Sequence, residues 1–313
     1  NGFQLFDFGL VHVQVQTYLE QCRRICIGEN TQSVHTIHFL ACIDYGRNRR
    51  NQCRISKYLC SRYNQLFCAE GFIQTKKQMN IYRANIIHTP TPNAFEICPK
   101  AYICVGDDGC VEGIYEQLPS CYSASQVTDF GDHLLIPAFC DMHVHAPQYR
   151  NMGVAMDEEL LQWLNKYTFP EEIRFAEMEH AQRMYSRFVH ELWMQGTMRS
   201  AVFATSHIPA TLVLADMFLQ SGMGAYIGLV GMNRNCPQPL ICDTEQHLAG
   251  LQTLIQCLHD RQKDEINPLC KPIVTPRFIP SCTPDMLEQL GRMAQQYSLP
   301  VQSHLSENMA EIE

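Results

Sequence analysis

The sequence predicts an α/β protein that contains part of a (β/α)8 barrel of the TIM type, about five of its eight strands, preceded by part of a small β-sandwich domain. The first observation is that short apolar runs alternate with helical patterns throughout residues 133–313. The second is that residues 79–132 hold only strand-like runs separated by turn sequences. The third is a pair of histidines directly after the first apolar run of the alternating region, where such barrels place functional residues.

Residues 1–78 differ in composition from the rest of the chain. They hold ten Lys and Arg against five Asp and Glu, and all fourteen methionines and all sixteen prolines lie at or after Met79. The segment is either a small N-terminal domain or a stretch read through from upstream of a start at Met79. We favour read-through and assign the segment no function. Its basic cluster is predicted to be a solvated run of charge: Arg47, Arg49, Arg50 and Arg54.

The small domain is predicted over residues 79–132. Its strand-like runs cover 81–87, 101–105 and 113–115, and Thr-Pro-Thr-Pro and Gly-Asp-Asp-Gly sequences lie between them. Short turns of this kind join antiparallel neighbours, so we expect a small antiparallel sheet.

The barrel region is predicted over residues 133–313, and helices connect its strands. The predicted strands are 133–141, 197–203, 225–230, 273–278 and 301–305. The predicted helices are 158–166 with Asp157 as N-cap, 177–195 ended by Gly196, 209–220, 244–261 and 284–297. Strands joined in this way run parallel with right-handed crossovers, and a closed barrel would need three more of them.

Composition narrows the classes of function. The net charge of −8 argues against nucleic acid as a partner. No run approaches eighteen apolar residues and the N-terminus lacks a secretory pattern, so we expect no membrane partner and a cytoplasmic location. The sixteen cysteines include no Cys-x-x-Cys pair, and we expect free, mostly buried thiols.

Two strand ends carry residues suited to metal chemistry. His143 and His145 follow the first barrel strand, and residues two apart in a strand point to the same face. A divalent metal at the mouth of a barrel can be held by such a pair. His304 ends the fifth strand as a candidate third ligand, and Glu307 follows three residues later as a candidate proton shuttle.

The motifs around these residues resemble a known family. Residues 135–145 (LIPAFCDMHVH) are similar to the first-strand motif of the amidohydrolase superfamily. Within that superfamily, the chain resembles the guanine deaminases in a series of further motifs. The resemblance covers essentially all of residues 79–313, with the motifs in the same order. These are 145–149 (HAPQY), 160–170 (LLQWLNKYTFP), 203–205 with His207, 274–278 (VTPRF) and 302–308 (QSHLSEN).

The resemblance implies a site and a reaction. His143, His145 and His304 match zinc ligands, Glu307 matches the catalytic acid/base, and residues that hold the purine are matched by Gln148, Arg277 and Phe278. The implied reaction converts guanine to xanthine and ammonia with one Zn²⁺ per subunit, in a homodimer when full length. The family also uses a strand-six histidine and a strand-eight aspartate, and the chain ends at Glu313. We therefore expect a fragment of low stability with little activity alone.

Other interpretations stay open at this point. The chain could be a related amidohydrolase that deaminates another aminated heterocycle, or a non-catalytic homologue that serves as a binding or assembly protein. At the level of single residues, Arg277 could be only an ion-pair residue and Phe278 only a core residue.

Overall fold

The computed structural model describes residues 79–312, apart from 107–108, 124 and 266–267, and residues 1–78 with their basic cluster lie outside it. The chain divides into two compact units between Pro137 and Ala138. The sequence placed the boundary between residues 132 and 133, inside a strand of the first unit. Pro137 lies at the division, and a proline interrupts a strand because it has no N–H for the ladder.

The first unit contains a four-stranded sheet in the order β3-β2-β1-β4. Its strands are β1 (Asn80–Thr91), β2 (Ala94–Val105), β3 (Val111–Tyr115) and β4 (Val127–Leu135). β2 runs antiparallel to β1 and β3, but β4 runs parallel to β1, so the prediction of a purely antiparallel sheet is wrong at β4. The predicted first barrel strand, 133–141, is also wrong. Its first residues complete β4, and a separate strand begins beyond Pro137.

The core of the first unit follows the period of two expected of strands. Tyr82, Ala84 and Ile86 of β1 pack against Ala101 and Ile103 of β2 in one buried cluster. Residues of the opposite register form a second cluster on the other face: Met79, Ile81 and Cys104.

The second unit is a partial barrel of parallel strands. β5 (Phe139–His145), β6 (Thr197–Phe203), β7 (Gly224–Gly228) and β9 (Cys270–Pro272) form one sheet in chain order. Two short strands, β8 (Val230–Gly231) and β10 (Thr275–Pro276), pair just beyond β7 and β9. The predicted fifth strand is present only as isolated parallel bridges, Val274 to Val301 and Phe278 to His304. The parallel order of the strands is therefore as predicted. The first strand begins later than predicted, the third and fourth are each broken in two, and the fifth is reduced to bridges.

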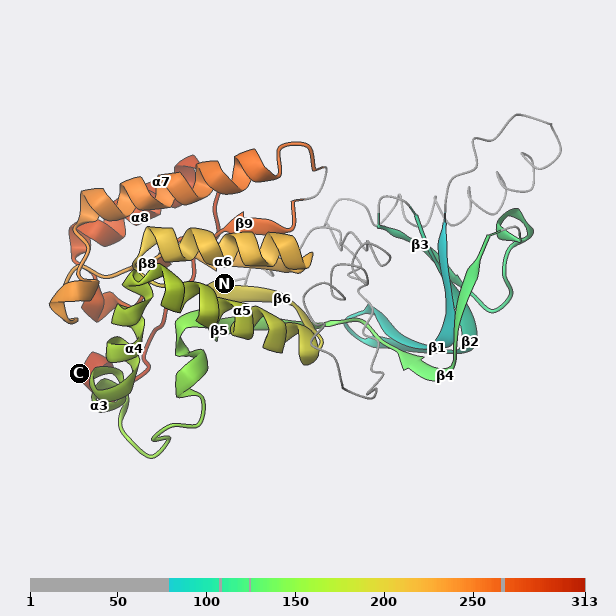
Figure 1. The fold of residues 1–313 in the computed structure, drawn as a ribbon, viewed down its shortest axis with the longest axis horizontal. Helices are drawn as coiled ribbons and strands as arrows, with labels where there is room; N and C mark the ends of the chain where they lie inside the picture. The colour runs from blue at the N-terminus through green and yellow to red at the C-terminus, as the bar shows by residue number, and fades with distance from the viewer. Residues whose placement is uncertain (1–78, 107–108, 124, 266–267, 313) are drawn as a thin grey trace. The chain divides into compact units, whose positions relative to one another are not determined.

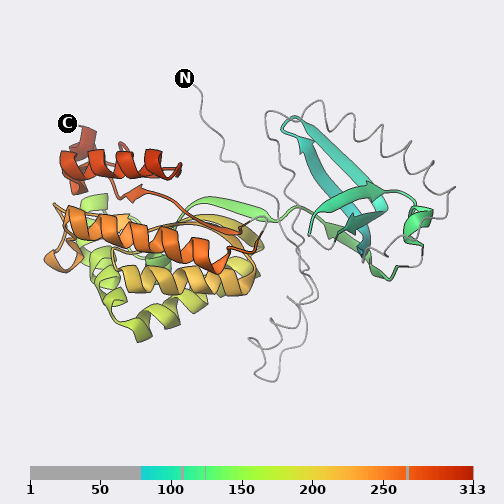
Figure 2. The same cartoon turned by 90° about the horizontal axis from the view of Figure 1, so that it is seen from above.

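Helices cover the sheet in the same order as the strands. The longer ones are α5 (Met178–Met194), α6 (Ile208–Ser221), α7 (Thr244–Arg261) and α8 (Pro284–Gln296). α6 packs between α5 and α7, and α7 packs on α8 (Figures 1 and 2). Asp243 caps α7 by accepting the Gln246 N–H at 2.8 Å, and Gly196 ends the turn after α5 with a φ of 76°. Shorter helical segments are η1 (Ser120–Tyr122), η2 (Ala146–Asn151), η4 (Arg174–Ala176), η5 (Gln238–Leu240), η6 (Ile279–Ser281) and α9 (Met309–Ile312).

The prediction of one regular helix over 158–166 is wrong. One turn of α-helix, α3 (Leu160–Trp163), runs into a π-helical turn, η3 (Leu164–Thr168), and then into α4 (Phe169–Ile173). Pro170 has no N–H to donate four residues back, so an α-helical ladder cannot run through it and the turn widens. The cap is also Glu159 rather than Asp157, and it makes no side-chain capping bond.

No helix in the described part of the chain is long and apolar enough to cross a lipid bilayer.

Candidate metal centre and active site

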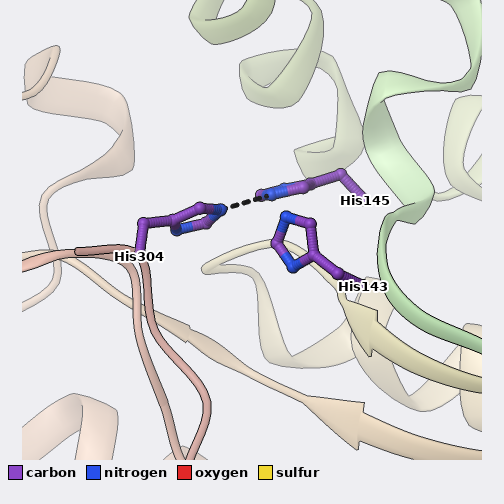
Figure 3. A group of neighbouring side chains, drawn as sticks. All are labelled: His143, His145 and His304. Carbon is purple, nitrogen blue, oxygen red and sulfur yellow. Dashed lines mark hydrogen bonds between the residues drawn. The ribbon is translucent and has the colours of Figure 1, made fainter. Parts of the chain in front are cut away.

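Three histidines meet at the carboxyl ends of the parallel strands of the second unit. His143 and His145 lie at the end of β5, and the bridge to Phe278 places His304 beside them. One ligand nitrogen from each ring lies within 4.8 Å of the others, and the Nε2 atoms of His145 and His304 are 3.0 Å apart (Figure 3). The structure therefore brings together the three predicted metal ligands. His145 and His304 are 159 residues apart in sequence.

Hydrogen bonding determines which nitrogen of His304 can bind a metal. Its Nδ1 lies 2.6 Å from the carbonyl oxygen of Arg277. A carbonyl oxygen can only accept, so Nδ1 carries the hydrogen and the Nε2 of the neutral ring has a free lone pair. That lone pair is the one directed toward His145.

The electrostatics of the site favour neutral imidazoles. Burial lowers the pKa of His143, and the neighbouring His304 lowers it further against an opposing effect of Glu307. Burial lowers the pKa of His145 well below its usual value, and the charge of Arg277 lowers it further. Neutral rings at pH 7 are the form that binds metal.

The donor set fits a divalent metal such as zinc. Two nitrogens that bind one tetrahedral zinc ion at about 2.0–2.1 Å lie about 3.3 Å apart, close to the 3.0 Å between the Nε2 atoms of His145 and His304. The lone pair of His304 Nε2 accepts from His145 Nε2 at 3.0 Å, so the hydrogen of His145 lies on Nε2, and its buried Nδ1 lacks a partner within the described residues. Metal binding through His145 Nε2 therefore requires this hydrogen to leave that nitrogen.

A phenylalanine forms the floor of the metal centre. Phe203, at the end of β6, is fully buried and lies opposite His145 in the parallel register. Its ring centroid is 4.5 Å from that of His145, 5.0 Å from that of His143 and 4.6 Å from that of His304. This apolar floor excludes water from one side of the three rings, and the sequence analysis gave Phe203 no role.

Arg277 lies beside the metal centre as one half of a buried ion pair. Its Nη1 donates to Oε2 of Glu172 at 2.6 Å, and its guanidinium carbon lies 5.1 Å from the ring centre of Phe169. Its backbone carbonyl lies 2.6 Å from Nδ1 of His304, so the residue is next to one of the three histidines. Of the two roles left open for Arg277, the ion pair is therefore present.

The other predicted site residues lie near the three histidines in the chain or are bridged to one of them. Gln148 is half-buried in η2, three residues after His145, and Phe278 is buried beside His304. Glu307 is exposed in the turn after His304, where Ser306 adopts a φ of 57° and reverses the chain. The charge of Glu307 opposes the lowering of the His143 pKa.

Sequence analysis missed Phe169 and Glu172 as well as Phe203. The quoted motif 160–170 ended two residues before Glu172. A weak signal was available, because Glu171 and Glu172 stand between Phe169 and Ile173 in the sequence. Both carboxylates are buried, and buried carboxylates are almost always paired.

Comparisons with known proteins identify the family of the chain. The family model described as "Amidohydrolase family" matches residues 134–313. A guanine deaminase of Dictyostelium discoideum is 35% identical over 257 residues, which are 77% of this chain and 56% of that protein. A probable guanine deaminase of Schizosaccharomyces pombe is 41% identical over 57% of this chain and 34% of its own.

A solved structure is similar to the chain in three dimensions. The crystal structure of guanine deaminase from C. acetobutylicum, with bound guanine in the active site, superposes with a TM-score of 0.70 at 42% identity. The alignment covers 75% of this chain and 54% of that one, so the chain spans about half the length of the relatives it matches. Because the family model covers more than half of its residues, the chain belongs to the amidohydrolase family.

Proposed function

We propose that the chain carries the first part of the active site of a zinc-dependent guanine deaminase, which hydrolyses guanine to xanthine and ammonia. The observation that carries the proposal is the cluster of three histidines, one of which is hydrogen-bonded through its Nδ1 to the backbone carbonyl of Arg277. The relative whose structure contains guanine is 42% identical to this chain.

His143, His145 and His304 would hold the zinc ion. When bound, zinc supplies a water whose pKa is lowered to about 7, which makes a nucleophile available at neutral pH. The lowered pKa values of His143 and His145 and the hydrogen bond from His304 Nδ1 to the Arg277 carbonyl support this ligand role.

Three residues would bind the purine. Arg277 presents N–H donors suited to O6 and N7, the same edge that arginine recognises on guanine in DNA. Gln148 can both donate and accept, which suits an amide-like purine edge. Phe278 would provide an apolar wall beside His304.

Glu307 would move the protons. As water adds at C2, the Glu307 carboxylate takes the first proton of the water and passes it to N3 of the ring. It then takes the second proton from the new hydroxyl on C2 and passes it to the leaving amine. The C2–N2 bond breaks, ammonia leaves, and the oxygen of water remains on C2 as the carbonyl of xanthine.

The remaining expectations belong to the whole protein. We propose guanine as a small-molecule substrate, a homodimer as the assembly and the cytoplasm as the location.

Selective binding tests the function most directly, because the chain spans about half the length of its relatives. The zinc-loaded 313-residue chain would be dialysed against radiolabelled guanine and, in parallel, adenine, with xanthine formation followed in the same samples. We expect retention of guanine over adenine, and loss of that retention in Arg277→Lys. Equal retention of the two purines would favour another aminated heterocycle as substrate, and no retention of either would contradict the proposal.

A further inference from the structure

Glu172 holds the side chain of Arg277 in place. Its Oε2 accepts from Arg277 Nη1 at 2.6 Å, and its Oε1 has no hydrogen-bond partner among the described residues. We propose that Glu172 is a positioning residue that orients the Arg277 guanidinium for the purine, an inference that rests on the proposed function.

Both members of this ion pair are buried, so each charge depends on the other. Arg277 is 3% exposed and Glu172 is 1% exposed. An unpaired charge at such a position would be poorly solvated, so each group requires the other. The pair uses Nη1 of a guanidinium that carries five N–H donors, which leaves other donors of the same rigid plane for a ligand.

Phe169 restricts the guanidinium in a second direction. It precedes Glu172 by three residues on α4, so both side chains leave the same face of the helix. The guanidinium carbon of Arg277 lies 5.1 Å from the centre of the Phe169 ring, and the Glu172 carboxylate binds Nη1 at the edge of the guanidinium. Contacts on the face and the edge together set the orientation of a planar group.

The backbone of Arg277 links this orientation to the metal centre. The Arg277 N–H donates to Gly231, and its carbonyl accepts from both the N–H and the Nδ1 of His304. The main chain is thus tied to a metal ligand and the side chain to α4. Glu172 therefore sets how far the guanidinium extends from the histidines, which is the spacing that a bound purine must match.

The adjacent Glu171 provides a matched control. It is also a buried glutamate on α4, but its carboxylate accepts from Arg174 at 2.9 Å, His180 at 2.8 Å and Arg150 at 3.2 Å. These partners belong to the helical framework, so Glu171 has a structural role of comparable burial without a bond to Arg277.

The experiment compares Glu172→Gln with Glu171→Gln in the full zinc-loaded chain. Equilibrium dialysis with radiolabelled guanine gives Kd, thermal unfolding gives Tm, and metal analysis gives zinc content. For Glu172→Gln we expect Kd to rise by about tenfold or more, since a charge-assisted hydrogen bond that orients the ligand's donor is lost. For Glu171→Gln we expect a lower Tm with Kd within about threefold of the unaltered chain.

Two further variants keep the inference testable if Glu172→Gln folds poorly. Glu172→Asp retains the charge on a shorter side chain and should raise Kd to an intermediate value. In an Arg277→Lys background, Glu172→Gln should raise Kd no further, because the guanidinium that Glu172 orients has already been removed. A Kd in Glu172→Gln or Glu172→Asp that matches the unaltered chain would overturn the positioning role while leaving the proposed function intact. Absence of guanine binding by the unaltered chain would overturn both.

Discussion

The metal centre depends on a few atoms whose states are determined by their neighbours. The Arg277 carbonyl places the hydrogen of His304 on Nδ1, and burial keeps His143 and His145 neutral. The ring of Phe203 packs against the imidazole rings of all three histidines. Each ligand is thus oriented before any metal binds, which reduces the cost of assembling the site.

Replacing His145 should abolish tight zinc binding. His145→Ala removes the nitrogen that faces His304 at 3.0 Å, and we expect zinc affinity to fall by at least about tenfold, since even second-shell losses reach that size. Metal analysis after dialysis against a competing chelator measures the effect. His259→Ala, an exposed histidine on α7, is the control and should keep full zinc content. Equal zinc retention in the two variants would contradict the ligand assignment.

Replacing Glu307 should affect turnover without affecting metal binding. Glu307→Gln keeps the shape of an exposed side chain but cannot accept a proton, so whatever xanthine formation the unaltered chain shows should fall to the level of a sample without protein. Zinc content and guanine Kd should stay near those of the unaltered chain, as measured by metal analysis and dialysis. An unchanged rate of xanthine formation would exclude Glu307 as the proton carrier.

At the scale of elements, close packing between strands explains why β7 ends in glycine. A Cβ on Gly228 would lie 1.9 Å from the Thr275 hydroxyl and 2.7 Å from the Gln302 amide nitrogen. That amide also donates to Thr275 at 3.0 Å and to the Val202 carbonyl at 3.2 Å. A small residue on β7 therefore allows one side-chain network to join β6, β10 and the last strand position.

Gly228→Ala should destabilise the second unit. The added methyl group must displace Thr275 or Gln302, and overpacking of this kind costs about 1–3 kcal/mol. Urea unfolding measures the change. Gly291→Ala in α8 is the control, because nothing lies within 4 Å of its Cβ and alanine favours a helix by about 0.5–1 kcal/mol. Equal stability of the two variants would show that β7 can move away from its neighbours.

α7 carries a buried histidine that links stability to pH. His247 is fully buried, neither ring nitrogen has a partner within the described residues, and burial lowers its pKa from 6.5 to about 4. The unfolded chain takes up this proton below pH 6.5 and the folded chain does not. Stability is therefore unaffected above pH 6.5, falls as the pH drops from 6.5 toward 4, and levels off below that.

His247→Leu should remove part of this pH dependence. Between pH 7.5 and pH 5 the histidine accounts for a loss of about 2 kcal/mol in unfolding free energy. Urea unfolding at both pH values, with chelator present so that metal release does not contribute, should show a smaller loss in His247→Leu. The same loss in both proteins would mean that His247 protonates without unfolding.

At the scale of the whole molecule, the proposed metal site depends on the fold of the second unit. The three ligands come from the first and last strand positions of the second unit, so they converge only when the strands between them are in place. A metal that binds the folded state alone stabilises it in proportion to its excess over Kd.

Zinc should therefore raise the Tm of the chain. At a free zinc concentration of 100 times Kd we expect about 2.7 kcal/mol of added stability, visible in thermal unfolding with and without chelator. The His145→Ala variant should show no zinc-dependent shift. A similar shift in that variant would indicate that the stabilising metal binds elsewhere.

The sequence by itself determined the parallel strand order, most helix positions and the identity of the three histidines. These features follow from local periodicity and from short motifs such as His143-Val144-His145, which depend on neighbours in the chain. Helix α7 and strand β6 agree with their predicted bounds because one amphipathic or apolar pattern fills each of them without interruption.

Tertiary structure alone decided the features that depend on partners distant in sequence. Whether β4 ran parallel to β1 depended on a ladder between segments about 46 residues apart, for which the alternating pattern of either strand holds no information. The π-helical turn before α4 placed Glu172 beside Arg277, 105 residues later. A buried charge reveals in sequence only that it needs a partner, and the fold selects which partner it has.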